Sequence, residues 1–192
     1  MTNDATANNF IPSEILHGVF LDVLDLGTLL QGASGIGKSE LALELINRGH
    51  KLIADDAPEF QLTESNKIYG HCPPVLKDFI EVRGLGILNL RAMFGDKALS
   101  PNKRLQLIIR LESNMDKIGE NAQLWESDRL GSMQHMTSVL NIDIPEIKIP
   151  VAPGRNIAIV IEAAVRNHLL YLDGYNAAED FIQRQQEAIN SE

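Results

Sequence analysis

The segment from residue 32 to residue 39 constrains this chain most, because it matches the phosphate-binding pattern GxxxxGK[ST] at every fixed position. Glycines in such a loop let backbone N–H groups surround an anion, the lysine reaches the β- and γ-phosphates, and the serine hydroxyl binds Mg²⁺. We therefore expect the loop to bind the phosphates of a nucleotide, with Ser39 as a metal ligand. The loop residues are Gly32, Ala33, Ser34, Gly35, Ile36, Gly37, Lys38 and Ser39.

The segments on either side of the loop agree with this interpretation. Residues 26–31 are a short apolar run of strand length, and residues 40–46 are apolar except for a polar stripe formed by Glu40 and Glu44. This predicts the order strand, loop and amphipathic helix, in which the positive end of the helix dipole adds to the anion site. A glycine-rich turn that matches the pattern by chance would not need these flanks.

The composition is that of one globular domain with at most short appendages. The chain has 192 residues, of which 44% are hydrophobic and 22% charged, and its net charge of −9 argues against a nucleic-acid surface. Cys72 is the only cysteine, so an intrachain disulfide is excluded. The polar N-terminus lacks the features of a secretory signal, and no apolar run is long enough to cross a bilayer. We expect a cytoplasmic protein with no membrane partner.

The pattern along the chain predicts an α/β domain built on a mixed β-sheet, because strands outnumber helices and do not alternate with them regularly. Pro145 and Pro150 should confine the last strand to an edge or a loop. We expect a flexible tail over residues 1–12, a catalytic domain over 13–175, and a C-terminal helix within 176–192 that packs on the core or on a neighbouring subunit. Strands are expected at 17–23, 26–31, 51–54, 58–62, 67–69, 79–82, 87–90, 105–111 and 142–151, and the later helices at 156–170 and 177–189.

Several polar residues outside the loop are candidates for chemistry. Asp55 and Asp56 follow a predicted strand, where a carboxylate can hold Mg²⁺ or accept a proton near the γ-phosphate, although such a pair can also cap a turn or face solvent. Glu81 and Arg83 lie two apart and so share one face of an extended segment, where one suits Mg²⁺ and the other phosphate. A hairpin with a surface ion pair is the alternative there.

Three further residues are undecided from spacing alone. His17 opens the first predicted strand, and Arg129 lies in a polar stretch. Arg155 precedes a predicted helix, where a cation is unfavourable unless an anion is bound as well.

Taken together, these motifs resemble those of the HPr kinase/phosphorylase family, bifunctional bacterial enzymes of the sugar phosphotransferase system. The resemblance runs from His17 to beyond Asn167, and the segment 81–89 (EVRGLGILN) is its most specific part. The matching motifs, in family order, are HGV at 17–19, the loop through Glu40, RGH at 48–50, ADD at 54–56, residues 81–89, DRLG at 128–131 and residues 150–156.

The resemblance implies a phosphate-loop core related to that of phosphoenolpyruvate carboxykinase, assembled as a homohexamer. It implies ATP- and Mg²⁺-dependent phosphorylation of a serine on the carrier protein HPr, and reversal by inorganic phosphate with release of pyrophosphate. Asp56 would be the base in one direction and the acid in the other, with His17, Lys38 and Arg129 also catalytic. The ligands implied for Mg²⁺ are Ser39 and Glu81. Arg83 and Arg155 would bind the phosphates, and residues 150–155 would matter chiefly for the reverse reaction.

The chain departs from the family pattern at three places. Only a short tail precedes His17, so we expect a short form without the usual N-terminal domain. Ala33 stands where an acidic or amide residue is common, and Pro58 closely follows the aspartate pair. The competing hypotheses are a kinase acting on an HPr paralogue or a small molecule, a non-catalytic nucleotide sensor, and a plain ATPase.

Overall fold

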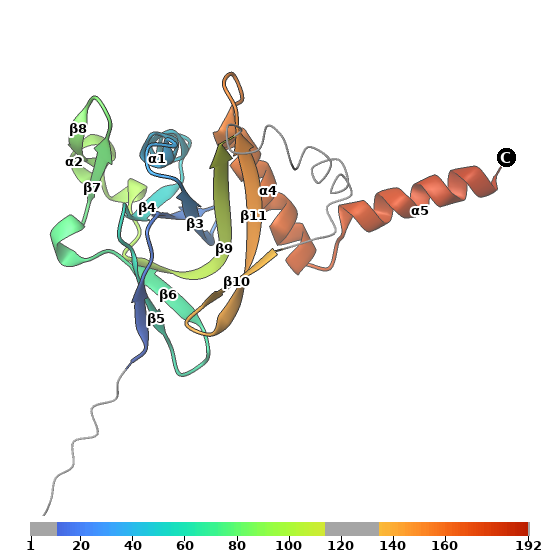
Figure 1. Cartoon of the computed structure of the whole chain (residues 1–192), viewed down its shortest axis with the longest axis horizontal. Coiled ribbons are helices and arrows are strands. Elements are labelled where there is room, and N and C mark those ends of the chain that lie inside the picture. The colour runs from blue at the N-terminus through green and yellow to red at the C-terminus, as the bar shows by residue number, and fades with distance from the viewer. Residues whose placement is uncertain (1–10, 114–134, 192) are drawn as a thin grey trace, which may run out of the picture.

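The computed structural model describes residues 11–113 and 135–191. Its strands form a nine-stranded sheet with helices against it and a separate two-stranded sheet (Figure 1). Among these residues, no helix is both long and apolar enough to span a membrane. The elements are β1 (Ser13–Ile15), β2 (Val19–Val23), β3 (Leu26–Gly32), α1 (Lys38–Asn47), β4 (Lys51–Ala54), β5 (Glu59–Leu62), β6 (Ile68–His71), η1 (Pro74–Leu76), β7 (Phe79–Val82), β8 (Gly86–Asn89), α2 (Leu90–Phe94), η2 (Asp96–Ala98), β9 (Asn102–Ser113), β10 (His135–Val139), β11 (Ile142–Val151), α4 (Ile157–Leu172) and α5 (Ala177–Asn190).

The main sheet has the strand order β10-β11-β9-β3-β2-β4. Strands β3, β9 and β11 are parallel, whereas β2 is antiparallel to both β3 and β4, so β4 runs in the same direction as those three. A smaller antiparallel sheet, β1-β5-β6, is joined to it because β9 pairs first with β6 and then with β3. The predicted mixed sheet is therefore confirmed.

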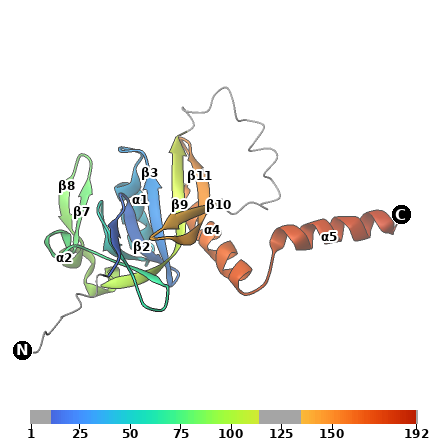
Figure 2. The same cartoon turned by 60° about the horizontal axis from the view of Figure 1, so that its bottom comes forward.

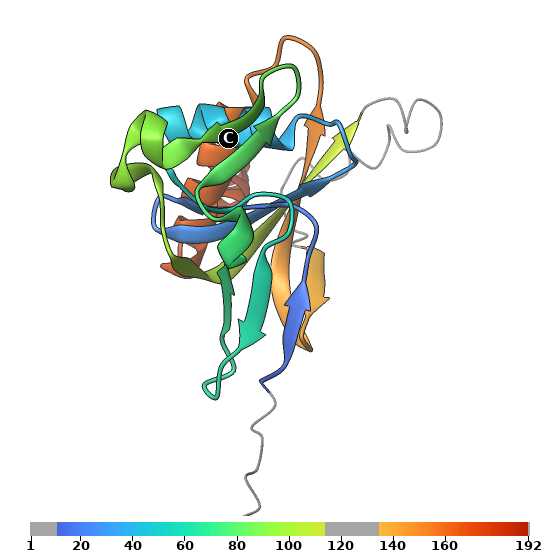
Figure 3. The ribbon, with the colours of Figure 1, turned by 90° about the vertical axis from the view of Figure 1, so that its left-hand side faces the viewer.

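Two hydrophobic cores lie on opposite faces of the main sheet, and β2 serves both because strand side chains alternate. Val19 and Leu21 face the core shared with α1 and α4, whereas Phe20 faces the core shared with the smaller sheet. The rings of Phe20 and Phe60 meet edge to face at 5.0 Å. A Cβ at Gly70 would lie within 2.6 Å of both rings, so only glycine fits there. Figure 3 shows α1 and α4 together on one side of the strands.

The strand directions bring distant segments of the chain to one edge of the main sheet. The carboxyl ends of β3, β4, β9 and β11 share this edge, where ligands usually bind in open α/β sheets. The antiparallel strand β2 begins at the same edge. The strand order therefore places residues 152–156, the phosphate loop, His17 and the Asp55–Asp56 pair in that sequence along it.

The last strand agrees with the prediction, whereas the first site residue differs from it. β11 lies between β9 and β10, but the two partners pair with different residues and only Glu146 pairs on both sides. Pro145 and Pro150 therefore each sit where one side of the strand is unpaired, as an edge position requires. His17 does not open a strand. It lies in the connection between β1 and β2, because the chain turns at Gly18 before pairing begins at Val19.

Helix α5 projects away from the rest of the molecule (Figure 2). None of its residues is buried. Packing of this helix on the core or on a neighbouring subunit stays a prediction. The predicted N-terminal tail lies outside the described residues up to residue 10. The order strand, loop, helix around residues 32–39 is confirmed, as are the hairpins β2–β3 and β5–β6.

Candidate active site

The phosphate loop connects β3 directly to α1. Gly35 and Gly37 have φ angles of 78° and 97°, which side chains with a Cβ rarely adopt, and Gly37 is the N-cap of α1. The ammonium of Lys38 donates hydrogen bonds to the carbonyl oxygens of Gly32 (3.0 Å) and Ala33 (3.2 Å). The cation therefore lies across the loop, where it would meet bound phosphates.

Asp55 connects the loop to two other elements. Its carboxylate accepts a hydrogen bond from the Ser39 hydroxyl (3.2 Å) and one from the backbone N–H of Glu81 (3.0 Å). The side chain is buried, and burial raises its pKa despite these hydrogen bonds. The sequence marked the aspartate pair for Mg²⁺ binding or proton transfer but gave Asp55 no role separate from that of Asp56. The available signal was its position directly after the apolar strand β4, which turns the first acid of the pair inward.

Ser39 and Asp55 suit Mg²⁺, because both supply the hard oxygen ligands that this cation prefers. Glu81, the predicted metal ligand, contributes its backbone N–H to Asp55 and has an exposed side chain. No group of three or more His, Cys, Asp or Glu side chains that could hold a metal exists within 11–113 and 135–191. Few protein ligands are usual for Mg²⁺, which takes the others from phosphates and water.

Asp56 and His17 form a pair at the protein surface. His17 Nδ1 lies 2.9 Å from Asp56 Oδ1, and the two side chains are 58% and 72% exposed. The backbone supports the pair, because the N–H of Gly18 donates to the carbonyl of Asp56 (3.1 Å). Asp56 has a φ of 65°, a conformation that aspartate tolerates better than most residues. An exposed carboxylate next to an imidazole can exchange a proton with a hydroxyl that approaches from outside.

Arg83 reaches the phosphate loop from the β7–β8 hairpin. In β7 the side chains of Ile80 and Val82 are buried, and Glu81 points to the opposite, exposed face. A Cβ at Gly35 would lie 3.4 Å from Nη2 of Arg83, so the guanidinium stands directly against the loop. The alternative, a surface ion pair between Glu81 and Arg83, is not formed in the described part of the chain. This geometry favours contact with phosphate.

Arg155 lies on the other side of the loop, next to Asn156, which caps the N-terminus of α4. Its guanidinium donates to the carbonyl of Pro150 (3.3 Å) and so is held by its own loop. Arg129 lies outside the described residues. The edge of the sheet thus brings His17, Lys38, Ser39, Asp56 and Arg83 together, and separates Arg155 from the two aspartates.

An ion-pair cluster holds the two helices behind the site together. Glu162 of α4 accepts hydrogen bonds from Arg48 Nε (2.9 Å) and Nη2 (2.5 Å), and lies 2.9 Å from Nε2 of the buried His50. Hydrogen bonds from Arg48 lower the pKa of Glu162 to about 2, against the effect of burial and with the help of His50. The sequence marked the Arg48–His50 motif without a role. Its partner is 112 residues away from His50, which no local pattern reveals.

Comparisons with known proteins agree with this geometry. The family model of the HPr serine kinase C-terminal domain matches residues 8–185. HPr kinase/phosphorylase of Neisseria meningitidis is 49% identical over 91% of this chain and 53% of that protein. Its counterpart from Chromobacterium violaceum is 47% identical over 90% of this chain and 52% of that protein. The chain thus spans about half the length of the curated relatives it matches.

A solved structure supports the fold as well. The Hpr(Ser) kinase/phosphatase from Coxiella burnetii superposes with a TM-score of 0.76 at 35% identity, covering 88% of this chain and 98% of that one.

Proposed function

Because this chain belongs to the family of the HPr serine kinase C-terminal domain, we propose that it phosphorylates a serine of the carrier protein HPr with ATP and reverses this reaction by phosphorolysis. The single observation that best supports the proposal is the juxtaposition of the Asp56–His17 pair with the phosphate loop at one sheet edge. A nucleotide sensor that only binds would not need an exposed base beside its γ-phosphate.

In the forward reaction Asp56 accepts the proton of the serine hydroxyl. The serine oxygen then bonds to the γ-phosphorus of ATP, and the bond from that phosphorus to the bridging oxygen breaks to release ADP. Lys38 and Arg83 neutralise the negative charge on the transferred group. His17 orients the carboxylate of Asp56 through their 2.9 Å contact.

The reverse reaction uses the same groups. An oxygen of inorganic phosphate held in the loop bonds to the phosphorus of phosphoserine, and the phosphorus–serine oxygen bond breaks. Asp56 returns a proton to the serine oxygen, and the products are serine and pyrophosphate. One carboxylate can serve both directions, because the group that accepts the serine proton in one direction returns it in the other.

Mg²⁺ would be held by Ser39 and Asp55, with Glu81 close by, and would supply positive charge to the phosphate oxygens. We further propose a cytoplasmic role in the phosphotransferase system, as expected for an enzyme acting on HPr. A homohexamer is proposed on the family resemblance. It is consistent with the exposed apolar residues Phe181 and Ile189 on α5, and light scattering of the purified protein would measure the assembly mass.

The proposal is tested by intact-mass measurement of HPr incubated with the protein, ATP and Mg²⁺, followed by exchange of ATP for phosphate. We expect HPr to gain one phosphate on serine and then to lose it with stoichiometric release of pyrophosphate. No change in HPr mass, despite measurable ATP binding, would overturn HPr as the substrate.

A further inference from the structure

We propose that Gln31 and Arg110 are positioning residues for the reacting carboxylate: with Glu146 they form a row of side chains across the main sheet that fixes the backbone of His17 and so holds its imidazole against Asp56. This inference rests on the proposed function for the identity of the reaction. It gives a role to side chains that the sequence analysis did not mark.

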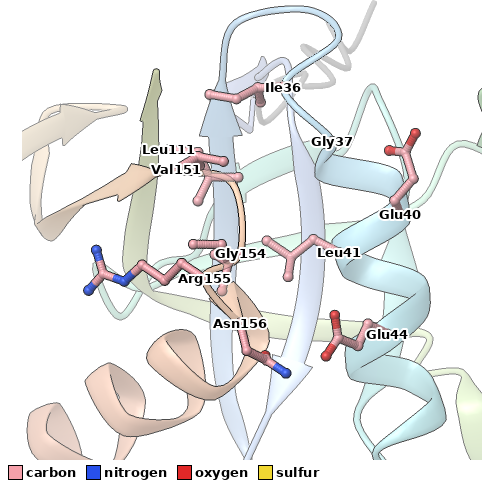
Figure 4. A pocket seen from close by; sticks show the side chains of 11 residues that line it. Ile36, Gly37, Glu40, Leu41, Glu44, Leu111, Val151, Gly154, Arg155 and Asn156 are labelled. Carbon is pink, nitrogen blue, oxygen red and sulfur yellow. The ribbon is translucent and has the colours of Figure 1, made fainter. Parts of the chain in front are cut away.

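The row crosses three neighbouring strands on one face of the main sheet. Figure 4 shows Leu111 of β9 on the face that carries α1, and successive side chains of a strand point to opposite faces. Arg110 therefore lies on the other face, together with Gln31, its direct partner between β9 and β3. On β11 the partner of Arg110 is Lys148, and Glu146, two residues earlier, shares that face.

The row is anchored at the buried carboxylate of Glu146. Arg110 donates to it through Nε, 3.1 Å from each oxygen, and through Nη2 at 2.8 Å, and the Thr137 hydroxyl of β10 donates at 2.8 Å. Burial disfavours the ionised form of Glu146, but the hydrogen bonds from Arg110 and Thr137 outweigh it and lower its pKa. An ionised carboxylate bound in this way keeps the guanidinium in one orientation.

The guanidinium in turn orients the side-chain amide of Gln31. Nη2 of Arg110 also donates to Oε1 of Gln31 at 3.1 Å. Because a guanidinium has only donors, it must face the amide oxygen, and this directs the amide nitrogen away from it. There Nε2 of Gln31 donates to the carbonyl oxygen of His17 at 3.4 Å.

This last hydrogen bond is long, but close packing on β3 supports the same stretch of backbone. A Cβ at Gly18 would lie 2.4 Å from the carbonyl oxygen of Leu30 and 3.4 Å from Cγ of Gln31. The backbone at Gly18 therefore rests directly on β3 and on the stem of the Gln31 side chain.

One peptide group connects the row to the reacting carboxylate. The carbonyl of His17 faces Gln31, and the N–H of Gly18, in the same peptide group, donates to the carbonyl of Asp56 at 3.1 Å. The imidazole of His17 then lies 2.9 Å from Oδ1 of Asp56. Both side chains are largely exposed, so the position of this pair depends on the backbone that carries it. Loss of the amide of Gln31 should therefore displace the imidazole from the carboxylate.

The first test measures HPr phosphorylation and phosphorolysis by Gln31→Met, which nearly keeps the volume of the side chain and removes its amide. We expect kcat to fall at least about tenfold in both directions, because the base loses its support. The KM for ATP should stay within about twofold, because the phosphate loop itself is unchanged. Thr137→Val is the matched control, since it removes a hydrogen bond from the same carboxylate at the end of the row remote from His17. Its kcat should stay within about twofold of the wild type.

The second test asks whether Gln31 acts through His17. In a His17→Ala background, Gln31→Met should lower kcat by less than about twofold further, because the group that it positions is already absent. A role of Gln31 in stabilising the sheet or the phosphate loop would leave the full loss in place.

A third readout needs no HPr. The Cε1–H signal of His17 in a carbon–proton NMR spectrum, identified by its absence in His17→Ala, should shift in Gln31→Met and stay in place in Thr137→Val. Arg110→Lys replaces Gln31→Met if the latter does not fold. It keeps a cation for Glu146 but lacks the fork that also reaches Gln31, so kcat should fall about threefold and the same signal should shift.

The proposal is overturned if the losses in Gln31→Met and His17→Ala multiply, if the KM for ATP rises while kcat is unchanged, if Thr137→Val reproduces the loss, or if the His17 signal does not move. The inference and the proposed function fail separately. A shifted His17 signal in a protein that never phosphorylates HPr would retain the positioning role and remove the proposed reaction.

Discussion

The two sides of the phosphate loop differ in how they are built. On the side of His17, Asp55 and Asp56, called the acid side below, each carboxylate is held by another element. Asp55 accepts hydrogen bonds from Ser39 of α1 and from the backbone of Glu81 in β7, and Asp56 lies 2.9 Å from His17. On the far side the guanidinium of Arg155 turns back onto its own loop. Because proton transfer and phosphoryl transfer need polar groups in fixed positions, we infer that both reactions use the acid side.

Asp56→Asn is the strongest test of the claim that both reactions use the acid side. It removes the proposed base but keeps the size of the side chain. Serine phosphorylation and phosphorolysis should both fall by roughly 10²- to 10⁴-fold, the usual contribution of a general base. ATP affinity should change little, because Asp56 does not line the loop. Initial rates in each direction, with calorimetric ATP binding as the control, measure this. Loss of only one direction would show that a different group serves the other.

A second test concerns the cluster that holds α1 and α4 together on the far side. Glu162→Ala leaves Arg48 and the buried His50 without their shared carboxylate, so we expect a loss of about 3 kcal/mol in the free energy of unfolding. Urea titration of both proteins at pH 7 measures the difference.

The same residue predicts a dependence of stability on pH. Glu162 has a pKa of about 2 in the folded protein, below its ordinary value of 4.5. Its contribution to stability is therefore complete above pH 4.5 and is lost as the pH falls from there towards 2. The melting temperature of Glu162→Gln should fall less steeply than that of the wild type over this interval. Parallel curves would contradict the role assigned to this carboxylate.

Asp55→Asn should separate stability from function on the acid side. The amide oxygen can accept from the N–H of Glu81 and the amide nitrogen can donate to the Ser39 hydroxyl, so both contacts can be kept. The raised pKa of Asp55 means that its ionised form is disfavoured by folding, so wild-type stability declines as the pH rises through that pKa.

The variant should therefore be at least as stable as the wild type at pH 7, while its affinity for Mg²⁺ in the presence of ATP falls at least about tenfold. Thermal melts and a Mg²⁺ titration of the kinase rate provide the two readouts. A large destabilisation with unchanged Mg²⁺ dependence would assign Asp55 a structural role alone.

Local sequence patterns predicted those parts of the fold and of the site that depend on residues close together in the sequence. The phosphate loop depends on eight successive residues, and the hairpins depend on short apolar runs with turn residues between them. The strand β1 was not predicted, because it is short and its partner β5 lies far along the chain. β10 was also missed, although it forms a hairpin with β11, the next strand. The short helix α2 was also missed, although Asn89 caps it.

The finer assignments within the site depended on tertiary structure. His17 was expected in a strand, yet it lies just before β2, where the neighbouring end of β4 brings Asp56 to it. The sequence analysis did not distinguish the inward turn of Asp55 from the outward turn of Asp56, and the position of Asp55 directly after β4 was the only signal for it. Likewise, the proximity of Arg83 to Gly35 depends on how a separate hairpin packs against the loop.

The most direct test of this account compares ATP with pyrophosphate as the phosphoryl donor to HPr. Pyrophosphate is the reverse-reaction product and carries no nucleoside, so it should need the acid side alone. We predict that Asp56→Asn loses phosphorylation with both donors by a similar factor, because one carboxylate serves both reactions. Survival of either reaction in Asp56→Asn would contradict the assignment of both reactions to the acid side.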